Sequence, residues 1–253
     1  MTRSEAGAKQ HGRQLAGAVR FWLPVLAFVV LIRTFLFQPF HIPSESMMPT
    51  LLVGDSLFVS KFSYGYSRYS LPFAPPLWSG RIFAGKPQRG DVVVFRPPSD
   101  DSQDLIKRIV GLPGDRIQMI AGRLHINGEP VRREAMPDFL DSETRPGTTV
   151  RAKRWRETLP GGASYATLDL EEHGPLDDTP VYQVPPGHYF MMGDNRDDST
   201  DSRVLDEVGY VPLENIVGRA EIIYFSIGHG AAAWQVWRWP SAARWGRFFT
   251  ILR

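Results

Sequence analysis

The sequence predicts a mainly β protein, in which an antiparallel β-sheet or partly open barrel carries a smaller inserted β-subdomain and is anchored by one N-terminal transmembrane helix. Two observations predict the β body. The chain has 21 prolines and 23 glycines in 253 residues, which favours turns over long helices, and short strand-like runs recur after residue 50. An apolar run near the N-terminus predicts the helix, and the length suffices for a substantial core.

The membrane helix is predicted at residues 18–38, after an N-terminal segment at 1–17. Phe21 to Ile32 carries no charge, and apolar neighbours extend the run to about 20 residues, enough to cross a bilayer as a helix. Arg33 lies near the end of the run, so its guanidinium can reach the lipid headgroups. A cleaved signal peptide has a similar pattern, but no small-x-small cleavage site follows Phe37.

Charge predicts the orientation of this helix. Four basic residues and one acidic residue precede the uncharged run that begins at Phe21, namely Arg3, Lys9, Arg13 and Arg20 against Glu5. Because positively charged flanks stay in the cytoplasm, the N-terminus is expected there. Everything after Pro39 is then expected on the outer face of the membrane.

The strand-like runs are separated by turns such as Pro-Gly-Asp at 113–115 and Asn-Gly-Glu at 127–129. Such turns join antiparallel neighbours, and helical periodicity is hardly visible in this part of the chain. The predicted strands are Ser56–Phe62, Asp91–Phe95, Leu105–Val110, Arg116–Ile120, Arg123–Ile126, His188–Met192 and Ala220–Ile227.

Residues 132–182 interrupt the body formed by 39–131 and 183–230. Basic residues dominate the first half of this insertion and acidic residues the second, with prolines and glycines between. A structureless loop of this length is uncommon inside a compact domain. We therefore expect a small accessory β-subdomain with mobile loops.

Two other segments concentrate aromatic side chains. Tyr64 to Phe83 holds three prolines among its aromatics, and both contact with the bilayer interface and burial under the sheet fit that composition. The tail at 231–253 mixes four tryptophans with four arginines, which is typical of the headgroup zone. Packing of the tail on the core is the alternative.

Composition argues against several classes of function. A net charge of +2 without a basic stripe argues against nucleic acid as a partner. Cysteine is absent, so there is no disulfide framework, thiolate zinc site or cysteine nucleophile. The six histidines are scattered, and none has the paired spacing of a metal site. Neither a metal nor a cofactor is expected, and a catalyst would use side-chain oxygen or nitrogen.

A serine pair lies where the predicted helix would emerge into water. Residues 43–52 read Pro-Ser-Glu-Ser-Met-Met-Pro-Thr-Leu-Leu, and the two prolines restrict the backbone to an exposed bend. Ser46 is a candidate nucleophile in this bend. Ser44 could donate its hydroxyl to an oxyanion, together with the Ser46 backbone amide. An ordinary Ser/Pro turn would have the same local sequence.

A serine hydroxyl needs a base within hydrogen-bond reach, and Lys107 is the candidate. Strand alternation in the run around it would place Lys107 and Ile109 on one face. Lysine is a base only when neutral, so its pKa must fall from ~10.4 to about 8 or below, a shift of ~2 units or roughly 3 kcal/mol. Burial supplies shifts of that size; the expected apolar neighbours are Leu105, Ile106, Ile109 and Met48. A solvated strand lysine is the alternative.

Two further segments complete the pattern. Leu-Ile-Lys-Arg-Ile-Val-Gly-Leu-Pro-Gly-Asp begins at Leu105, and Gly-Asp-Asn-Arg-Asp-Asp-Ser-Thr-Asp-Ser-Arg begins at Gly193. Together with the serine segment, they resemble the signature of bacterial type I signal peptidases, membrane-bound serine/lysine proteases that remove targeting peptides from exported proteins. The resemblance covers 37–55, 89–97, 105–117, 185–203 and 211–225.

The resemblance implies a role for each matched residue. Ser46 matches the nucleophile, Lys107 the general base, Ser199 the serine that orients the lysine, and Ser44 the contributor to the oxyanion site. The sequence departs from the family's pattern at Glu45, where many members have glycine, and at position 198, which is Asp where Asn is common. Ion-pair supports of the site, with Arg108 paired to Asp194, are expected at Arg108, Asp194, Asp201 and Arg203.

The resemblance also implies a substrate and a location. Signal-peptide-bearing preproteins are the expected substrates, cut after small residues at Ala-x-Ala type sites, and selection of small side chains requires shallow apolar pockets. The chain is expected to be a single-pass protein of the bacterial cytoplasmic (inner) membrane, with its catalytic domain on the periplasmic face. Membrane lipid is an expected partner, and the protein translocation channel is a candidate one. Substrate-binding residues are expected at Phe40, Ile42, Leu51 and Ile106.

Two other functions fit parts of the pattern. Self-cleaving repressors share the Ser/Lys pair, but they carry a DNA-binding module and lack an N-terminal anchor, so the span from Val19 to Phe37 argues against them. A membrane-tethered β-domain that binds periplasmic partners without catalysis would have the three polar segments as ordinary turns. A serine-directed inhibitor that reacts only when Ser46 is present would discriminate.

Overall fold

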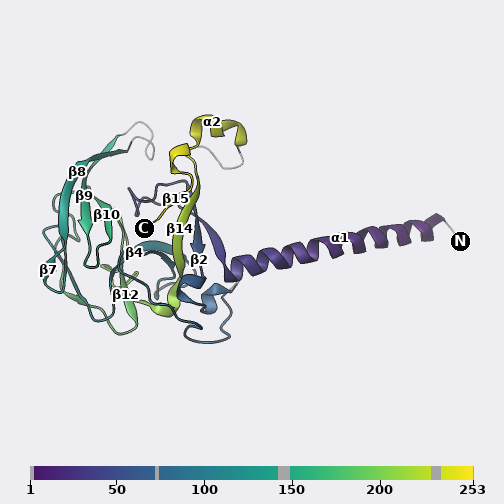
Figure 1. The fold of residues 1–253 in the computed structure, drawn as a ribbon, viewed down its shortest axis with the longest axis horizontal. Helices are drawn as coiled ribbons and strands as arrows, with labels where there is room; N and C mark the ends of the chain where they lie inside the picture. The colour runs from purple at the N-terminus through teal and green to yellow at the C-terminus, as the bar shows by residue number, and fades with distance from the viewer. Residues whose placement is uncertain (1–2, 72–73, 142–148, 229–234, 253) are drawn as a thin grey trace.

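The structure is a computed structural model that describes residues 3–71, 74–141, 149–228 and 235–252, with only the backbone described for 3–16. Figure 1 shows one long helix, α1 (Arg3–Phe35), projecting away from a β body. Residues Gly17–Phe35 of this helix have a mean hydropathy of 1.8 and are long and apolar enough to cross a membrane. Their large side chains are mostly exposed.

The helix ends earlier than the prediction of 18–38. Residues Phe37–His41 form strand β1 instead, which pairs antiparallel with the next strand. Pro39 lies inside this stretch, and proline within a helix removes a hydrogen-bond donor and clashes with the preceding turn. The single residue between helix and strand, Leu36, accepts a hydrogen bond from Lys61 N at 3.0 Å.

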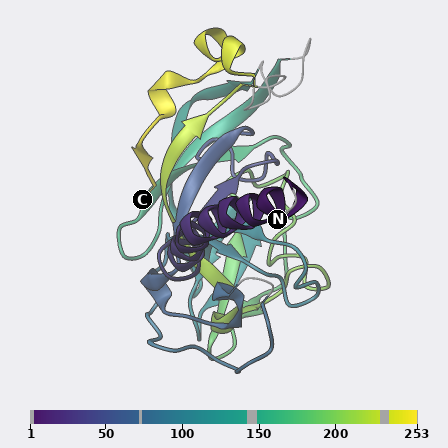
Figure 2. The same ribbon diagram turned by 90° about the vertical axis from the view of Figure 1, so that its right-hand side faces the viewer.

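The main sheet of the described residues has the strand order β1-β2-β14-β3-β4-β12-β13, with β15 paired to β14. All of its pairs are antiparallel, and Figure 2, which looks nearly along α1, shows the curled strands behind the helix. Beyond β1, the strands are β2 (Asp55–Ser60), β3 (Val92–Phe95), β4 (Leu105–Gly111), β12 (His188–Met192), β13 (Val211–Pro212), β14 (Ile216–Ser226) and β15 (Thr250–Ile251).

Two smaller sheets complete the described β structure. The inserted sheet has the order β10-β9-β8, and the other has the order β11-β5-β6-β7. The inserted strands are β8 (Arg132–Asp141), β9 (Val150–Thr158) and β10 (Ser164–Asp169); the others are β5 (Arg116–Ile120), β6 (Arg123–Ile126), β7 (Glu129–Pro130) and β11 (Tyr182–Gln183). The short helices are η1 (Phe62–Tyr64), η2 (Arg68–Ser70), η3 (Leu213–Asn215), η4 (Val236–Arg238), α2 (Trp239–Ala242) and η5 (Trp245–Arg247).

The predicted fold class is confirmed: the body is mainly antiparallel β and follows one N-terminal apolar helix. Strand β14 begins at Ile216, four residues before the predicted start. Gly218 obscures its pattern because glycine is depleted in strands. A side chain there would collide with the Ser60 carbonyl oxygen of β2, so only glycine lets the two strands approach this closely.

The two aromatic segments divide between burial and exposure. In the loop at 64–83, Tyr64 and Tyr69 are buried whereas Leu77 and Phe83 are exposed; Phe73 lies outside the described residues. The C-terminal tail packs on the body through β15 and an ion pair between Arg247 and Asp55, with 2.5 Å between Nη2 and Oδ2. Its exposed aromatic side chains are Trp237, Trp245 and Phe249, and Trp234 lies outside the described residues.

Candidate active site

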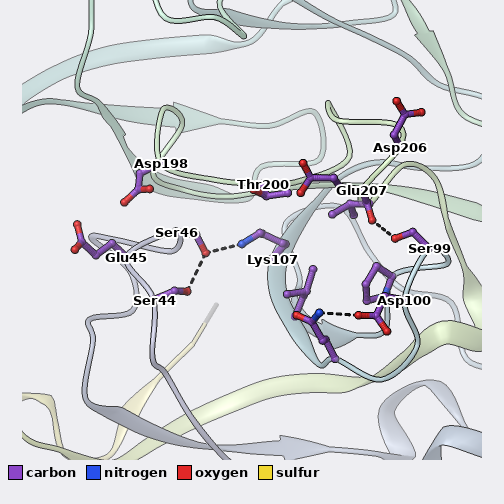
Figure 3. Close-up of a pocket in the computed structure, with 14 residues that line it drawn as sticks. Ser44, Glu45, Ser46, Ser99, Asp100, Lys107, Asp198, Thr200, Asp206 and Glu207 are labelled. Carbon is purple, nitrogen blue, oxygen red and sulfur yellow. Dashed lines mark hydrogen bonds between the residues drawn. The ribbon is translucent and has the colours of Figure 1, made fainter.

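The bend at 43–52 and strand β4 meet at a cavity of about 540 Å³. Figure 3 shows Ser46 and Lys107 pointing toward one another within it, with Ser44 beside them. Lys107 Nζ donates a hydrogen bond to Ser46 Oγ at 2.5 Å, and the Ser44 and Ser46 hydroxyl oxygens are 3.4 Å apart. Three of the predicted catalytic side chains therefore lie together.

Hydrophobic side chains on opposite sides of the bend hold Ser46 in place. Met47 and Leu51 are fully buried in the cluster beneath β2, β3 and β14. Met48 packs instead against Ala152 and Leu168 of the inserted sheet. Because consecutive side chains are anchored in two different clusters, the Ser46 backbone has little freedom and presents its hydroxyl to the cavity.

Lys107 lies in β4 and is only 4% exposed. Burial lowers the pKa of its amine from 10.5 to about 8, although the carboxylates of Asp201, Asp194 and Asp198 oppose that change. Leu105 and Ile109, two positions away on either side, belong to one apolar cluster, as strand alternation predicts. The amine thus has a pKa at which a substantial neutral fraction exists near neutral pH.

Ser199 belongs to the loop that follows β12. Its Oγ is buried and has no hydrogen-bond partner among the described residues. A Cβ at Gly193 would collide with Ser199 Oγ and with the Ser46 carbonyl oxygen. Glycine therefore allows this loop to pass directly against the serine bend, and it brings Ser199 next to the Ser46 backbone.

Two buried ion pairs hold the same loop. Arg108 and Asp194 form a bidentate pair, with Nε to Oδ1 at 2.8 Å and Nη2 to Oδ2 at 2.7 Å. Arg203 Nε donates to Asp201 Oδ1 at 2.8 Å, and Asp201 Oδ2 also accepts from the Gly193 backbone amide at 3.0 Å. Bidentate charge-assisted hydrogen bonds are geometrically specific, so the Arg108–Asp194 pair fixes the loop against β4 and the Arg203–Asp201 pair fixes the shape of the loop itself.

A third buried pair was not expected from the sequence. Arg196 of the loop donates to both carboxylate oxygens of Glu157 in β9, at 3.0 and 2.6 Å. Tyr165 of β10 lies beside this pair, and the Arg108 guanidinium stands 4.0 Å from the centre of its ring. Glu157 lies in the insertion that matches no motif, and one glutamate among many charged residues carries no signal of its role.

The residues expected to bind substrate belong to, or pack against, a core cluster that includes Met47 of the serine bend. Ile42 and Leu51 are buried in one core cluster, with Phe40 and Ile106 packed against it, and none of these four lines the described cavity of Ser46. Apolar lining of that cavity comes from Pro97, Leu105 and Val208; its acidic lining residues are Glu45, Asp100, Asp198, Asp206 and Glu207.

No group of three or more histidine, aspartate or glutamate side chains within the described part of the chain could hold a metal ion. Ser46 and Lys107 place a hydroxyl beside a buried amine. In such a pair, the neutral amine can take the hydroxyl proton and so activate the oxygen as a nucleophile.

Comparison with known proteins identifies the family of the chain. The family described as "Signal peptidase, peptidase S26" matches residues 15–225. A protein named Signal peptidase I from Rickettsia conorii is 43% identical over 210 residues, which cover 80% of this chain and 76% of that protein. One of the same name from Rickettsia prowazekii is 39% identical over 234 residues, covering 89% and 85%.

The chain belongs to the signal peptidases of family S26. Within that family, its relatives are bacterial type I signal peptidases, so it is a hydrolase that cleaves signal peptides from preproteins. A crystal structure of a signal peptidase I from Enterococcus faecalis is 28% identical and covers 53% of this chain and 97% of that one, with a TM-score of 0.31.

Proposed function

We propose that the protein is a serine endopeptidase that uses Ser46 as nucleophile and Lys107 as general base. The observation that carries this proposal is the 2.5 Å hydrogen bond between Lys107 Nζ and Ser46 Oγ inside a buried site. The neutral amine takes the hydroxyl proton while Oγ attacks the carbonyl carbon of the scissile peptide bond. The resulting ammonium gives that proton to the leaving nitrogen, and an acyl-enzyme remains.

The second half of the reaction reverses these roles. Lys107 takes a proton from water, the hydroxide attacks the acyl carbon, and the proton returns to Ser46 Oγ as the new carboxyl group leaves. The negative charge that develops on the carbonyl oxygen needs hydrogen-bond donors. The Ser44 hydroxyl, 3.4 Å from Ser46 Oγ, and the Ser46 backbone amide are the groups proposed for it, and Ser199 is proposed to orient the lysine.

The substrates are proposed to be exported preproteins cut after small residues at Ala-x-Ala type sites. We propose that α1 spans the bacterial inner membrane once, with the N-terminus in the cytoplasm and the catalytic domain on the periplasmic face. The 19-residue apolar segment Gly17–Phe35 supports this topology. Membrane lipid and the protein translocation channel are then the neighbours of the enzyme during protein secretion.

Cleavage of one exported preprotein in detergent tests the proposal. Ser46→Ala and Lys107→Met should each abolish cleavage, whereas Lys86→Met, at an exposed lysine, should leave it unchanged.

Lys107→Met should also raise the unfolding midpoint at pH 7, because a buried charged amine with its pKa lowered from 10.5 to about 8 costs about 3 kcal/mol. Cleavage by Lys107→Met at the wild-type rate would exclude the lysine as base.

A further inference from the structure

A second cavity, of about 460 Å³, is lined by residues from the end of α1 and from the β body. Three cationic side chains line it: Arg33 from the last turn of α1, Lys61 after β2, and Arg96 after β3. Asp104 is the carboxylate among its described lining residues. Positive charge therefore exceeds negative charge around this cavity, which is separate from that of Ser46.

Lys61 is the unusual member of this group, because its side chain is buried with only 3% exposed. Its Nζ donates to the Ser70 carbonyl oxygen at 2.7 Å, and a carbonyl carries no full charge to balance an ammonium. Burial lowers the pKa of Lys61 to about 8, Asp104 opposes that change, and Arg33 and Arg96 add to it. A buried cation in this setting is stabilised by an additional anion.

Asp104 does not balance the three cations. Its Oδ1 accepts a hydrogen bond from Arg96 Nε at 3.1 Å, and the Arg96 guanidinium lies 5.1 Å from the centre of the Tyr69 ring. Because Asp104 is paired with Arg96, the positive charges of Arg33 and Lys61 are left in excess around the cavity. An oxyanion with several acceptor oxygens, such as a phosphate, matches such a set of donors.

An apolar cavity of about 530 Å³ lies on the opposite face of β1 and shares the lining residue Arg33 with the cationic cavity. Its other lining residues are Phe28, Val29, Ile32, Phe37, Pro39, Phe58 and Ile222. An occupant with a phosphate at one end and a hydrocarbon chain at the other would reach from one cavity to the other past Arg33, around the edge strand β1. Free phosphate would leave the apolar one unfilled.

We propose that Arg33, Lys61 and Arg96 bind the phosphate of an anionic phospholipid, whose acyl chain lies in the apolar cavity beside α1. This inference rests on the proposed membrane topology, which puts Arg33 at the level of the lipid headgroups. Basic residues beside an anionic membrane surface are attracted to it. The bound lipid would connect the end of α1 to the residues of the main sheet that line the two cavities.

The test is lipid retention by the full chain in detergent micelles that contain equal amounts of phosphatidylglycerol and phosphatidylcholine, read by native mass spectrometry. Wild type should retain phosphatidylglycerol preferentially. Lys61→Met and Arg96→Gln should each reduce that preference about fivefold, the factor that ~1 kcal/mol represents. Asp104→Asn should increase it, an effect in the opposite direction that misfolding would not produce. Lys86→Met is the matched control.

Three outcomes would overturn the proposal. Unchanged preference in both cation variants would exclude these side chains, and displacement of the lipid by millimolar inorganic phosphate would assign the pocket to free phosphate. Equal retention of both lipids by wild type would remove the headgroup site but leave the membrane span intact. If Lys61→Met does not fold, Arg96→Gln and Asp104→Asn still decide the question. Failure of the chain to enter micelles or vesicles at all would instead contradict the span.

Discussion

At the residue scale, the environment of Lys107 determines when it can act. Its pKa is about 8 in the folded protein and 10.5 ordinarily, so the folded site releases this proton more readily than the unfolded chain. The lysine thus opposes folding below pH 8, and this unfavourable contribution fades as pH rises from 8 toward 10.5. The same burial that makes the amine a base therefore costs stability.

We expect kcat/KM to rise with pH and to level off above about pH 8, because only the neutral amine of Lys107 accepts the Ser46 proton. Peptide cleavage measured from pH 6 to pH 9.5 would check this. The unfolding midpoint measured over the same range shows whether a change in activity reflects unfolding. A flat profile between pH 6 and pH 9 would be inconsistent with a lysine base.

Ser199 should matter less than Ser46. Its Oγ has no hydrogen-bond partner within the described structure. In the proposed mechanism it only orients the lysine, which is one contribution to catalysis among several. Ser199→Ala should lower kcat by roughly 10- to 100-fold with little change in KM, whereas Ser46→Ala should remove activity. Equal and complete loss in both variants would show that Ser199 takes part in the bond-making steps.

At the element scale, the loop after β12 joins the bend, strand β4 and the inserted sheet. Its ion pairs connect it to Arg108 in β4 and to Glu157 in β9. A backbone bridge between Asn195 and Leu168 adds a further link to β10. The inserted sheet therefore holds the loop after β12 in place, although β8, β9 and β10 contribute no residue to the lining of the cavity of Ser46.

Glu157→Gln should loosen this support. The Arg196 guanidinium would remain buried without its counter-charge, and removal of one partner of a buried ion pair typically costs about 3–5 kcal/mol. We expect a lower unfolding midpoint and a lower kcat. Glu134→Gln, on the neighbouring strand β8 with an exposed partner in Arg132, is the control and should change neither. An unaltered unfolding midpoint in Glu157→Gln would show that the Glu157–Arg196 pair does not stabilise the fold.

The sequence predicted some strands and not others for clear reasons. Strands β5, β6 and β12 lie at the expected residues because apolar residues dominate or alternate between short turns. The strands of the insertion were expected only as an unspecified β-subdomain. Strand β8 is mostly exposed along its length and β9 carries four basic residues, so neither shows the half-buried alternation from which a strand is recognised.

At the scale of the whole molecule, the site joins segments far apart in the chain. Ser46 and Lys107 are 61 positions apart, and Arg108 and Asp194 are 86 apart. Local pattern alone could not bring them together, and the family resemblance indicated that they belong to one site. The Glu157–Arg196 pair and the packing of the tail depend on tertiary contacts, for which the sequence offers no local signal.

The proposed membrane topology predicts opposite labelling of the two ends of the molecule. The chain contains no cysteine, so in a single-cysteine variant a thiol reagent can label only the introduced residue. A membrane-impermeant maleimide should label Leu140→Cys, at an exposed position in β8, in intact spheroplasts. It should label Ala6→Cys only after the membrane is permeabilised. Reversed labelling would place the catalytic domain in the cytoplasm.

The connection between α1 and β1 has a consequence for where substrates can be cut. The Leu36 amide donates to Ile32 of the helix, and its carbonyl accepts from Lys61 beside the sheet, so no flexible spacer separates the two elements. In a membrane-spanning chain, the nucleophile would then sit at one fixed height above the bilayer. The distance of the nucleophile from the bilayer would then limit cleavage to the peptide bonds that a substrate presents at that same height.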